Sequence, residues 1–440
     1  MKKLFILESS FVVGFEHIEM FQGFTFVFFK NCQEVLDIAG IGWRYDALLN
    51  SLRANHLAYE TCAEESLEAY MRHHPCETLY ISDPGYMHML LSSALLLKFQ
   101  GRIYIFDKIN QTLKKPQFKE MNSMVHLLSQ NKKSWCASMD NQSRITFSRM
   151  TGKRCYFMLE GRKQTFIVPH TQTTSAGVEG YTFLCPERPH LRIKLYLRDL
   201  HPYEIEKLEK MVQIPHSFQD SAMPLALVYT YAHQPVGIVM KHFEGEEMDI
   251  ADLHQKARAL PLARSIIRQL IELSVFGIYP KDFSHNILCE EENGIAHLID
   301  LDSAQYLDYP AMVYPAQGLD CLPWEYYLPD IFFNAVELSY WVTYLLICTY
   351  QSDETFFGSY EVPLVESHMA LLEKQNARVA DLVRLAFENK EPLSLYRQLQ
   401  ALEGEVVQEP VSTPKRHWPL LADGILLLVT ILCVAVWKIM

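Results

Sequence analysis

The stretch GIYPKDFSHNILCEEENGIAHLIDLDS, residues 277–303, decides how the second half of the chain is interpreted. It contains two apolar runs, 286–289 and 295–299, and an acidic segment between them that ends in Asn293 and Gly294. An Asn-Gly pair suits a tight turn because both residues tolerate a positive φ. The stretch therefore predicts an acidic loop followed by a short β-hairpin.

Three polar side chains are expected to meet at one end of this hairpin. Asp282 and Asn286 lie just before its first strand, and Asp300 follows its second strand. Two carboxylates and an amide in one place suit a magnesium–nucleotide site, because Mg²⁺ takes oxygen ligands and shares them with phosphates. A surface hairpin with acidic neighbours by chance is the alternative.

Length and composition set the outer limits of the interpretation. A chain of 440 residues is long enough for two or three domains. The formal charge of −12 argues against a general nucleic-acid binder. The ten cysteines occur singly, with no Cys-x-x-Cys pair, which favours reduced thiols in a reducing compartment and no structural metal site.

The C-terminal residues 418–438 predict a transmembrane helix. Between Trp418 and Trp437 only Asp423 is charged, and a bilayer needs about 20 apolar residues. The tryptophans would lie at the two membrane interfaces, and more basic residues precede the run than follow it. The expected arrangement is a single-pass C-terminal anchor with the N-terminal domains in the cytoplasm, joined by a polar tether over residues 401–417. A buried C-terminal helix is the alternative.

Residues 1–110 predict a small α/β domain. Strand-like runs at 4–7, 24–29, 78–82 and 102–107 alternate with helix-like segments. This alternation is typical of parallel strands joined by helices. The segment 83–85, Asp-Pro-Gly, follows a predicted strand at a position where such domains bind ligands, so a recognition or regulatory role is expected.

Residues 111–163 are interpreted as a basic connecting region. Between 102 and 163 the chain has 13 Lys and Arg against four Asp and Glu, which is unusual in an acidic protein. A solvated linker explains this composition. The alternative is contact with the anionic inner leaflet of the membrane, which a C-terminal anchor would bring close.

Residues 164–400 form the largest predicted domain. Its parts, in order, are a turn with Gly177 and Gly180, a strand with Lys194, a helix over 202–212 with several glutamates, strands over 224–229 and 236–240, a linker, a helix over 262–276, and the hairpin. A Gly-x-x-Gly turn is a weak signal alone. It would let backbone N–H groups approach a phosphate with no Cβ in the way.

In this order the parts resemble a protein kinase, and in particular the bacterial protein-kinase-like proteins with an Ile-Asp-x-Asp-Ser metal-binding motif. The motifs that carry the resemblance are Lys194-Leu195-Tyr196, Gly237-Ile238-Val239-Met240-Lys241 and Ile299-Asp300-Leu301-Asp302-Ser303. The resemblance covers residues 164–397. It implies an α+β bilobal kinase-like domain that binds ATP and Mg²⁺.

The resemblance assigns the phosphate-binding roles. Gly177 and Gly180 would cover the ATP phosphates. Lys194 would pair with the α- and β-phosphates and be oriented by a glutamate of the next helix. Glu206 is the expected partner of Lys194, with Glu209 as the alternative.

The resemblance also assigns the base pocket, the metal ligands and the catalytic base. Met240 would line the adenine pocket, and the backbone from Lys241 through His242 to Phe243 would form the hinge. Asp282 would accept the proton of the substrate hydroxyl, while Asn286 and Asp300 would bind Mg²⁺.

Three functions remain open at this point. The first is a membrane-tethered, ATP-dependent phosphotransferase of the Ser/Thr protein-kinase type, acting on a protein substrate or signalling partner. The second is a pseudokinase scaffold, because Asn286 lies four residues after Asp282, where kinases have five. The third is a sugar or lipopolysaccharide kinase, whose relatives also carry an Ile-Asp-x-Asp pattern.

Overall fold

The computed structural model contains two compact units, residues 1–400 and 401–440. The structure describes residues 2–7, 11, 15, 17–64, 67–74, 76–82, 101–107, 112–114, 150–170, 180–200, 202–247, 256–280, 286–290, 294–307, 309, 373, 377, 380, 381 and 392–406. The second unit is described only over 401–406, the end of helix α12 (Pro392–Val406), so the first part of the predicted tether is helical. All other elements belong to the first unit.

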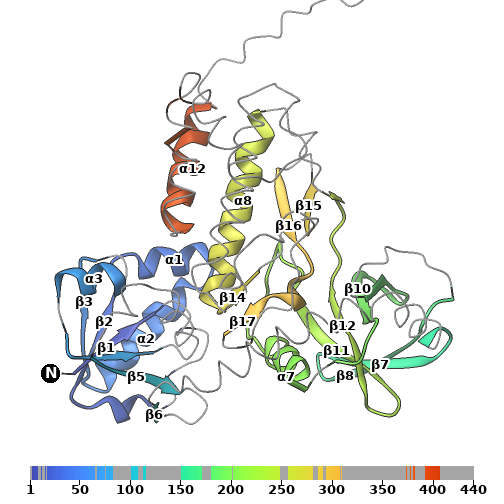
Figure 1. Cartoon of the computed structure of the whole chain (residues 1–440), viewed down its shortest axis with the longest axis horizontal. Helices are drawn as coiled ribbons and strands as arrows, with labels where there is room; N and C mark the ends of the chain where they lie inside the picture. The colour runs from blue at the N-terminus through green and yellow to red at the C-terminus, as the bar shows by residue number, and fades with distance from the viewer. Residues whose placement is uncertain are drawn as a thin grey trace, which may run out of the picture. The chain divides into compact units, whose positions relative to one another are not determined.

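A six-stranded sheet forms the N-terminal part of the first unit, in the order β3-β2-β1-β4-β5-β6 (Figure 1). Its strands are β1 (Lys2–Ile6), β2 (Phe24–Phe28), β3 (Ala58–Thr61), β4 (Thr78–Ile81), β5 (Arg102–Asp107) and β6 (Thr112–Lys114). Neighbours from β3 to β5 pair in parallel, and β6 runs antiparallel at one edge. The prediction of an α/β layer with parallel strands is confirmed.

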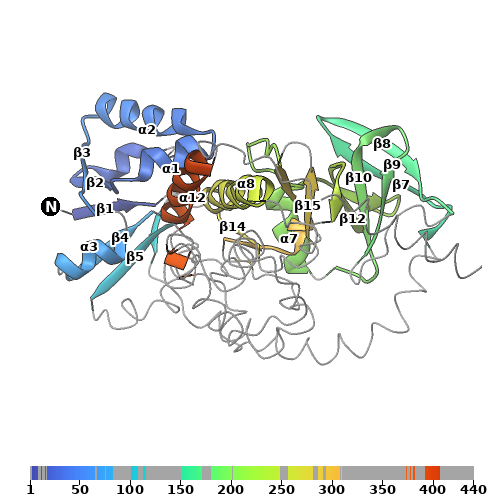
Figure 2. The ribbon, with the colours of Figure 1, turned by 90° about the horizontal axis from the view of Figure 1, so that it is seen from above.

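Helices cover both faces of this sheet (Figure 2). They are α1 (Cys32–Ile38), α2 (Gly42–Ala54) and α3 (Leu67–His73), and a 3-10 helix, η2 (Ile18–Phe21), precedes β2. Phe28 contacts Tyr45 of α2 on one face, and Phe5 contacts Tyr70 of α3 on the other, with ring centroids 5.3 and 5.0 Å apart. Both faces are apolar because parallel strands are usually buried on both sides. The predicted ligand position at 83–85 lies outside the described residues.

A second six-stranded sheet is antiparallel throughout, in the order β8-β7-β11-β12-β10-β9 (Figure 1). Its strands are β7 (Arg154–Leu159), β8 (Arg162–Ile167), β9 (Gly180–Cys185), β10 (Arg188–Tyr196), β11 (Pro224–Thr230) and β12 (Pro235–Lys241). The sheet thus begins inside the range 111–163 that the sequence assigns to a connecting region. Basic side chains on β7 and β8 contribute to the positive charge that suggested a linker.

One face of the antiparallel sheet forms an apolar core of its own. Cys155, Phe157, Ile193 and other buried side chains from all six strands make up this core. Phe166 on edge strand β8 contacts Phe183 on the opposite edge strand β9, with ring centroids 6.0 Å apart. The two edges of the sheet can touch only because the sheet curls. The other face is therefore the one available for polar side chains.

The elements that follow the antiparallel sheet in sequence include the long helix α8 and the β15–β16 hairpin (Figure 1). They are β13 (Glu246–Glu247), α8 (Lys256–Val275), β14 (Ile278–Tyr279), β15 (Ile287–Glu290), β16 (Ile295–Leu298), the 3-10 helix η4 (Leu301–Ser303) and β17 (Gln305–Tyr306), while α7 (Pro202–Met211) joins β10 to β11. β15 and β16 pair antiparallel with Ile287 opposite Leu298, and Gly294 has a φ of 63°. The predicted hairpin and both predicted helices are confirmed.

The predicted transmembrane helix lies near the C-terminus, at residues 418–438. No helix among the described residues is long and apolar enough to cross a membrane. The predicted span, 418–438, lies outside the described residues and stays a prediction.

Candidate functional site

Lys194 lies on the polar face of the antiparallel sheet. Successive side chains of a strand point to opposite faces, so Arg192, Lys194 and Tyr196 share one face of β10. Their neighbours Ile193 and Leu195 belong to the apolar core on the other face. The Lys194 side chain is only 3% exposed. A lysine is almost never buried without a partner, so its surroundings identify the site.

Two aspartates surround the Lys194 ammonium. Lys194 Nζ donates to Asp300 Oδ1 and to both carboxylate oxygens of Asp302, at 3.1 and 2.9 Å for Asp302. The Tyr196 hydroxyl donates to Asp302 Oδ2 at 2.8 Å. Asp302 is 3% exposed and Asp300 is 32% exposed. The cluster therefore has one buried carboxylate, which holds the lysine, and one that remains accessible.

The two carboxylates differ in their electrostatics. Burial raises the pKa of Asp300 in spite of the nearby Lys194 ammonium, and the Asp302 carboxylate adds to this effect. Burial also disfavours the charged form of Asp302, but the Lys194 ammonium and the Tyr196 hydroxyl outweigh burial and lower the pKa of Asp302. The Lys194 ammonium and the Tyr196 hydroxyl thus favour the ionised form of Asp302, whereas burial works against ionisation at Asp300.

The hairpin brings Asn286 and Asp300 to the same end of the site. Ile299 N donates to Asn286 O at 2.9 Å, so the residues beside the two ends of the hairpin are paired. Asp300 has a φ of 60°, in the left-handed region, and it precedes η4. Ser303 Oγ donates to Asp300 O at 2.9 Å and supports this turn. The hairpin therefore places the backbone of Asn286 beside Ile299, the residue before Asp300, while the metal-binding role of the two side chains stays a prediction.

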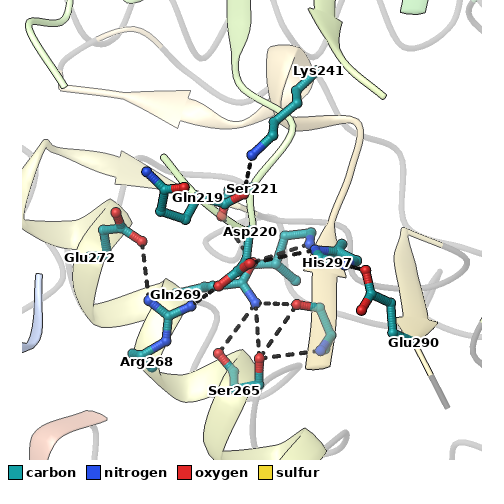
Figure 3. A network of polar contacts seen from close by, with 12 residues as sticks. Gln219, Asp220, Ser221, Lys241, Ser265, Arg268, Gln269, Glu272, Glu290 and His297 are labelled. Atoms are coloured by element: carbon teal, nitrogen blue, oxygen red, sulfur yellow. Dashed lines mark hydrogen bonds and ion pairs between the residues drawn. The ribbon is translucent and has the colours of Figure 1, made fainter. Parts of the chain in front are cut away.

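A buried glutamine fixes the hairpin to the antiparallel sheet (Figure 3). Gln269 of α8 is fully buried, and its Nε2 donates to Ala296 O at 2.5 Å while its Oε1 accepts from Leu298 N at 3.2 Å and from Ser221 Oγ at 3.0 Å. Ser221 also pairs with Leu298 in a parallel bridge, and it lies just before β11. This network holds Asp300, two residues beyond Leu298, at a fixed position relative to Lys194.

Charged groups surround the same junction (Figure 3). Arg268 donates to Asp220, and its guanidinium also lies 3.8 Å from Glu272. His297 Nε2 lies 3.0 Å from Glu290, and the His297 ring stacks on Phe243, with centroids 4.1 Å apart. Phe243 belongs to the predicted hinge. The predicted hinge, at Phe243, is therefore packed against strand β16 of the hairpin.

Gly180 makes room for Lys194. It opens β9 opposite Tyr196, and a Cβ at this position would lie 2.8 Å from Leu195 O and 3.1 Å from Lys194 Cγ. A side chain here would collide with the Leu195 carbonyl and press on the Lys194 side chain, so glycine has a steric role at Gly180. Its predicted contact with phosphates stays a prediction. Gly177 and Asp282 lie outside the described residues.

Helix α7 does not bring Glu206 to Lys194. Glu206 is exposed and accepts hydrogen bonds from Lys210, at 2.9 Å, and from the Tyr309 hydroxyl, at 2.6 Å. Glu209 is exposed as well. The two carboxylates at Lys194 are instead Asp300 and Asp302, which follow β16. The sequence did not identify Asp302 as a partner of Lys194.

The inward residues of α7 have other partners. Glu204 forms a bidentate pair with Arg198, at 2.8 and 2.6 Å. The buried Lys207 donates to Ala304 O at 2.9 Å, and its charge also favours the ionised form of Asp302. The alternation of acids in Asp300-Leu301-Asp302 was the available signal for a second buried carboxylate.

The predicted base pocket lies farther along the same face. Met240 of β12 is buried and is directly opposite Arg192 of β10. His242 follows β12, is half-buried, and its backbone N–H donates to His190 O at 2.9 Å. Burial lowers the pKa of His242, and the positive charge of Arg192 adds to this effect. These residues lie on the side of Lys194 that is away from Tyr196 and its partner Asp302.

The donors at the other end fit a magnesium ion that is shared with phosphates. No group of three His, Cys, Asp or Glu side chains in the described part of the chain is arranged to hold a metal. Mg²⁺ bound to nucleotides usually takes only one or two carboxylates from the protein, together with phosphate and water oxygens. One accessible carboxylate, Asp300, beside the amide residue Asn286 matches this ligand type.

Among solved structures, two kinases resemble this chain at low sequence identity. No family model matches the chain, and no curated protein matches it. The ROP18 kinase domain in complex with AMP-PNP and sucrose is 12% identical, with a TM-score of 0.40 over 66% of this chain and 95% of that chain. A rhoptry kinase from Toxoplasma gondii is 14% identical, with a TM-score of 0.39 over 58% of this chain and 85% of that chain. At these values the functional interpretation depends on the geometry of the Lys194 cluster.

Proposed function

We propose that this chain binds a magnesium–nucleoside triphosphate and transfers its terminal phosphoryl group, as a protein kinase does. The observation that supports this most strongly is the Lys194–Asp300–Asp302 cluster. A buried lysine from a central strand of an antiparallel sheet meets an aspartate from the end of a hairpin, which are the two groups that a kinase-type site needs for phosphates and metal.

The residues of the proposed site divide phosphate binding, metal binding and proton transfer among them. Lys194 is a point charge that binds the phosphates, and Asp302 together with Tyr196 orients it. Asp300 and Asn286 supply oxygen ligands for Mg²⁺, which when bound neutralises charge on the phosphates. Asp282 would accept the proton of the attacking hydroxyl. A serine or threonine of a protein is the proposed acceptor.

The pairing of Lys194 with two carboxylates has a consequence for nucleotide binding. Two negative groups compete with phosphates for one ammonium. Asp300 would hold Mg²⁺, which would neutralise this carboxylate, and Lys194 would then be available to the phosphates while Asp302 keeps it in place. Nucleotide affinity is therefore expected to depend strongly on Mg²⁺.

The test is phosphoryl transfer from γ-labelled ATP and GTP by the full-length chain in detergent, with casein and a lipid extract as acceptors. Wild type should transfer label to itself or to the protein, and Asp302→Asn should lose about tenfold or more, because a buried charged hydrogen bond contributes roughly 1.5–3 kcal/mol. Glu206→Gln is the matched control. It should change the rate by less than about twofold, since Glu206 is a surface ion-pair residue.

A result in which Glu206→Gln is as damaging as Asp302→Asn would contradict the assignment of the lysine's partner. Label found only in the lipid extract would replace the protein acceptor with a sugar–lipid acceptor. Absence of transfer together with Mg²⁺-dependent binding would leave a nucleotide-binding scaffold. The competition of two carboxylates for Lys194 is the observation that favours this second function.

We also propose that residues 418–438 attach the protein to a membrane. The apolar run between Trp418 and Trp437 supports this proposal. A chain that ends at residue 417 should leave the membrane fraction. Continued sedimentation with membranes would show that this run is not the sole attachment.

A further inference from the structure

Arg192 lies two residues before Lys194 on the same face of β10. It is directly opposite Met240 on β12 and opposite Leu184 on β9. Along a strand, two residues span roughly 6.6 Å, so the Arg192 backbone lies about that far from Lys194, on the side away from Tyr196 and its partner Asp302. Arg192 thus belongs to the end of the site where Met240 and His242 lie.

The Arg192 guanidinium has a buried donor with no partner. Its Nε is buried and has no hydrogen-bond partner in the described part of the chain. Burial lowers the pKa of Arg192. An unsatisfied buried donor on a charged group is costly, and native proteins seldom keep one without a reason. A ligand that accepts hydrogen bonds would satisfy it.

The position of Arg192 identifies the part of the ligand that it would meet. This step rests on the proposed function: if the phosphates lie at Lys194 and Asp300, the base lies toward Arg192 and His242. The other group at this end, Met240, is apolar and buried and can pack against a flat ring. An arginine offers a planar fork of donors, which suits a ring edge with two adjacent acceptors and also stacks on aromatic faces.

We propose that Arg192 recognises the nucleobase and selects guanine over adenine. The edge of guanine presents two adjacent acceptors, O6 and N7, and arginine binds this pair in a bidentate manner. The same edge of adenine presents the acceptor N7 and the N6 amino donor, and a donor facing the guanidinium leaves one hydrogen bond unmade. Arg192 is in this account a specificity-determining residue, distinct from the phosphate-binding Lys194.

The experiment measures binding of Mg-GTP, Mg-ATP and magnesium tripolyphosphate to the full-length chain in detergent by calorimetry. Wild type should bind Mg-GTP about tenfold or more tightly than Mg-ATP. Arg192→Met should bring the two affinities to within about twofold and should lower the tripolyphosphate affinity much less than the Mg-GTP affinity. Arg192→Lys keeps the charge without the fork and should also lose the preference.

Arg188→Met is the matched control, because Arg188 begins the same strand at its far end from Lys194. This variant should keep the preference for guanine. Equal binding of the two nucleotides by wild type, or a preference that survives in Arg192→Met, would overturn base selection and leave the proposed function intact. Binding of neither nucleotide by wild type would overturn both.

Discussion

The two six-stranded sheets of this chain bury different kinds of side chain. The parallel sheet has phenylalanines in its interior on both faces, such as Phe5 and Phe26. The antiparallel sheet has one apolar face, whereas its other face buries Lys194 against two aspartates. Apolar burial stabilises a fold directly, but a buried charge is costly unless it is paired. The antiparallel sheet therefore carries the buried charged cluster on which the proposed function rests.

The largest expected effect on stability is in the parallel sheet. Phe26 on β2 is fully buried, and Phe26→Ala should reduce the stability of this sheet by about 3–5 kcal/mol, because it removes a large side chain and leaves a cavity. Hydrogen exchange of β1 and β2 should become much faster, while nucleotide binding by the folded protein should not change. A loss of nucleotide affinity equal to that of a Lys194 variant would break the comparison.

An intermediate effect is expected at the junction between the antiparallel sheet and the hairpin. Gln269→Leu removes the hydrogen bonds of Gln269 to Ser221 Oγ, Ala296 O and Leu298 N. Leu298 N keeps Asp220 O as an acceptor and Ala296 O keeps Ser265 Oγ as a donor, so the main cost is roughly 1–3 kcal/mol for the buried Ser221 hydroxyl. Because these contacts position Asp300, Mg-nucleotide affinity should fall by about tenfold. Calorimetry tests this, with the exposed Gln213→Leu as the control. Unchanged affinity in Gln269→Leu would show that the network does not position the site.

The smallest expected effect is a pH dependence that originates at Asp300. Because the pKa of Asp300 is raised, this carboxyl takes up a proton at a higher pH than an ordinary aspartate. Mg-nucleotide affinity should therefore fall as the pH decreases through this raised pKa, since Mg²⁺ must then displace a proton. Asp300→Asn should remove this part of the pH profile, and Asp46→Asn, in the parallel-sheet region, should not. An identical profile in all three proteins would contradict the assignment.

The free energy of unfolding should change with pH in opposite directions for Asp300 and Asp302. The raised pKa of Asp300 contributes stability at low pH that is lost as the pH rises through its folded-state pKa. The lowered pKa of Asp302 contributes stability above its unfolded-state pKa that is lost as the pH falls through its folded-state pKa. Thermal unfolding of Asp300→Asn and Asp302→Asn across the acidic range separates the two contributions.

Much of the fold follows from local patterns in the sequence. Alternating strands and helices predicted the parallel sheet, and the run around Gly294 predicted the hairpin with Asn286 and Asp300 at one end. These features depend on contacts between near neighbours or on simple periodicity. The sequence also predicted that Lys194 lies on a strand between apolar neighbours.

The partner of Lys194 was not predictable in the same way. Glu206 and Asp302 are both acids at plausible places, and the choice depends on the orientation of α7, which is set by tertiary packing. α7 directs Lys207 inward to Ala304 O, while Glu206 contacts Tyr309. The curl of the antiparallel sheet, which brings edge strands β8 and β9 together, likewise depends on contacts between segments that are distant in sequence.

The most direct test of the central claim is the affinity of the full-length chain for the tighter-binding of Mg-ATP and Mg-GTP, measured by calorimetry for wild type and Lys194→Met. We expect Mg²⁺-dependent binding by wild type and a loss of about tenfold or more in Lys194→Met, with hydrogen exchange of β1 and β2 unchanged. Equal affinity of the two proteins, or no binding by wild type, would contradict the claim that the Lys194 cluster is a nucleotide site.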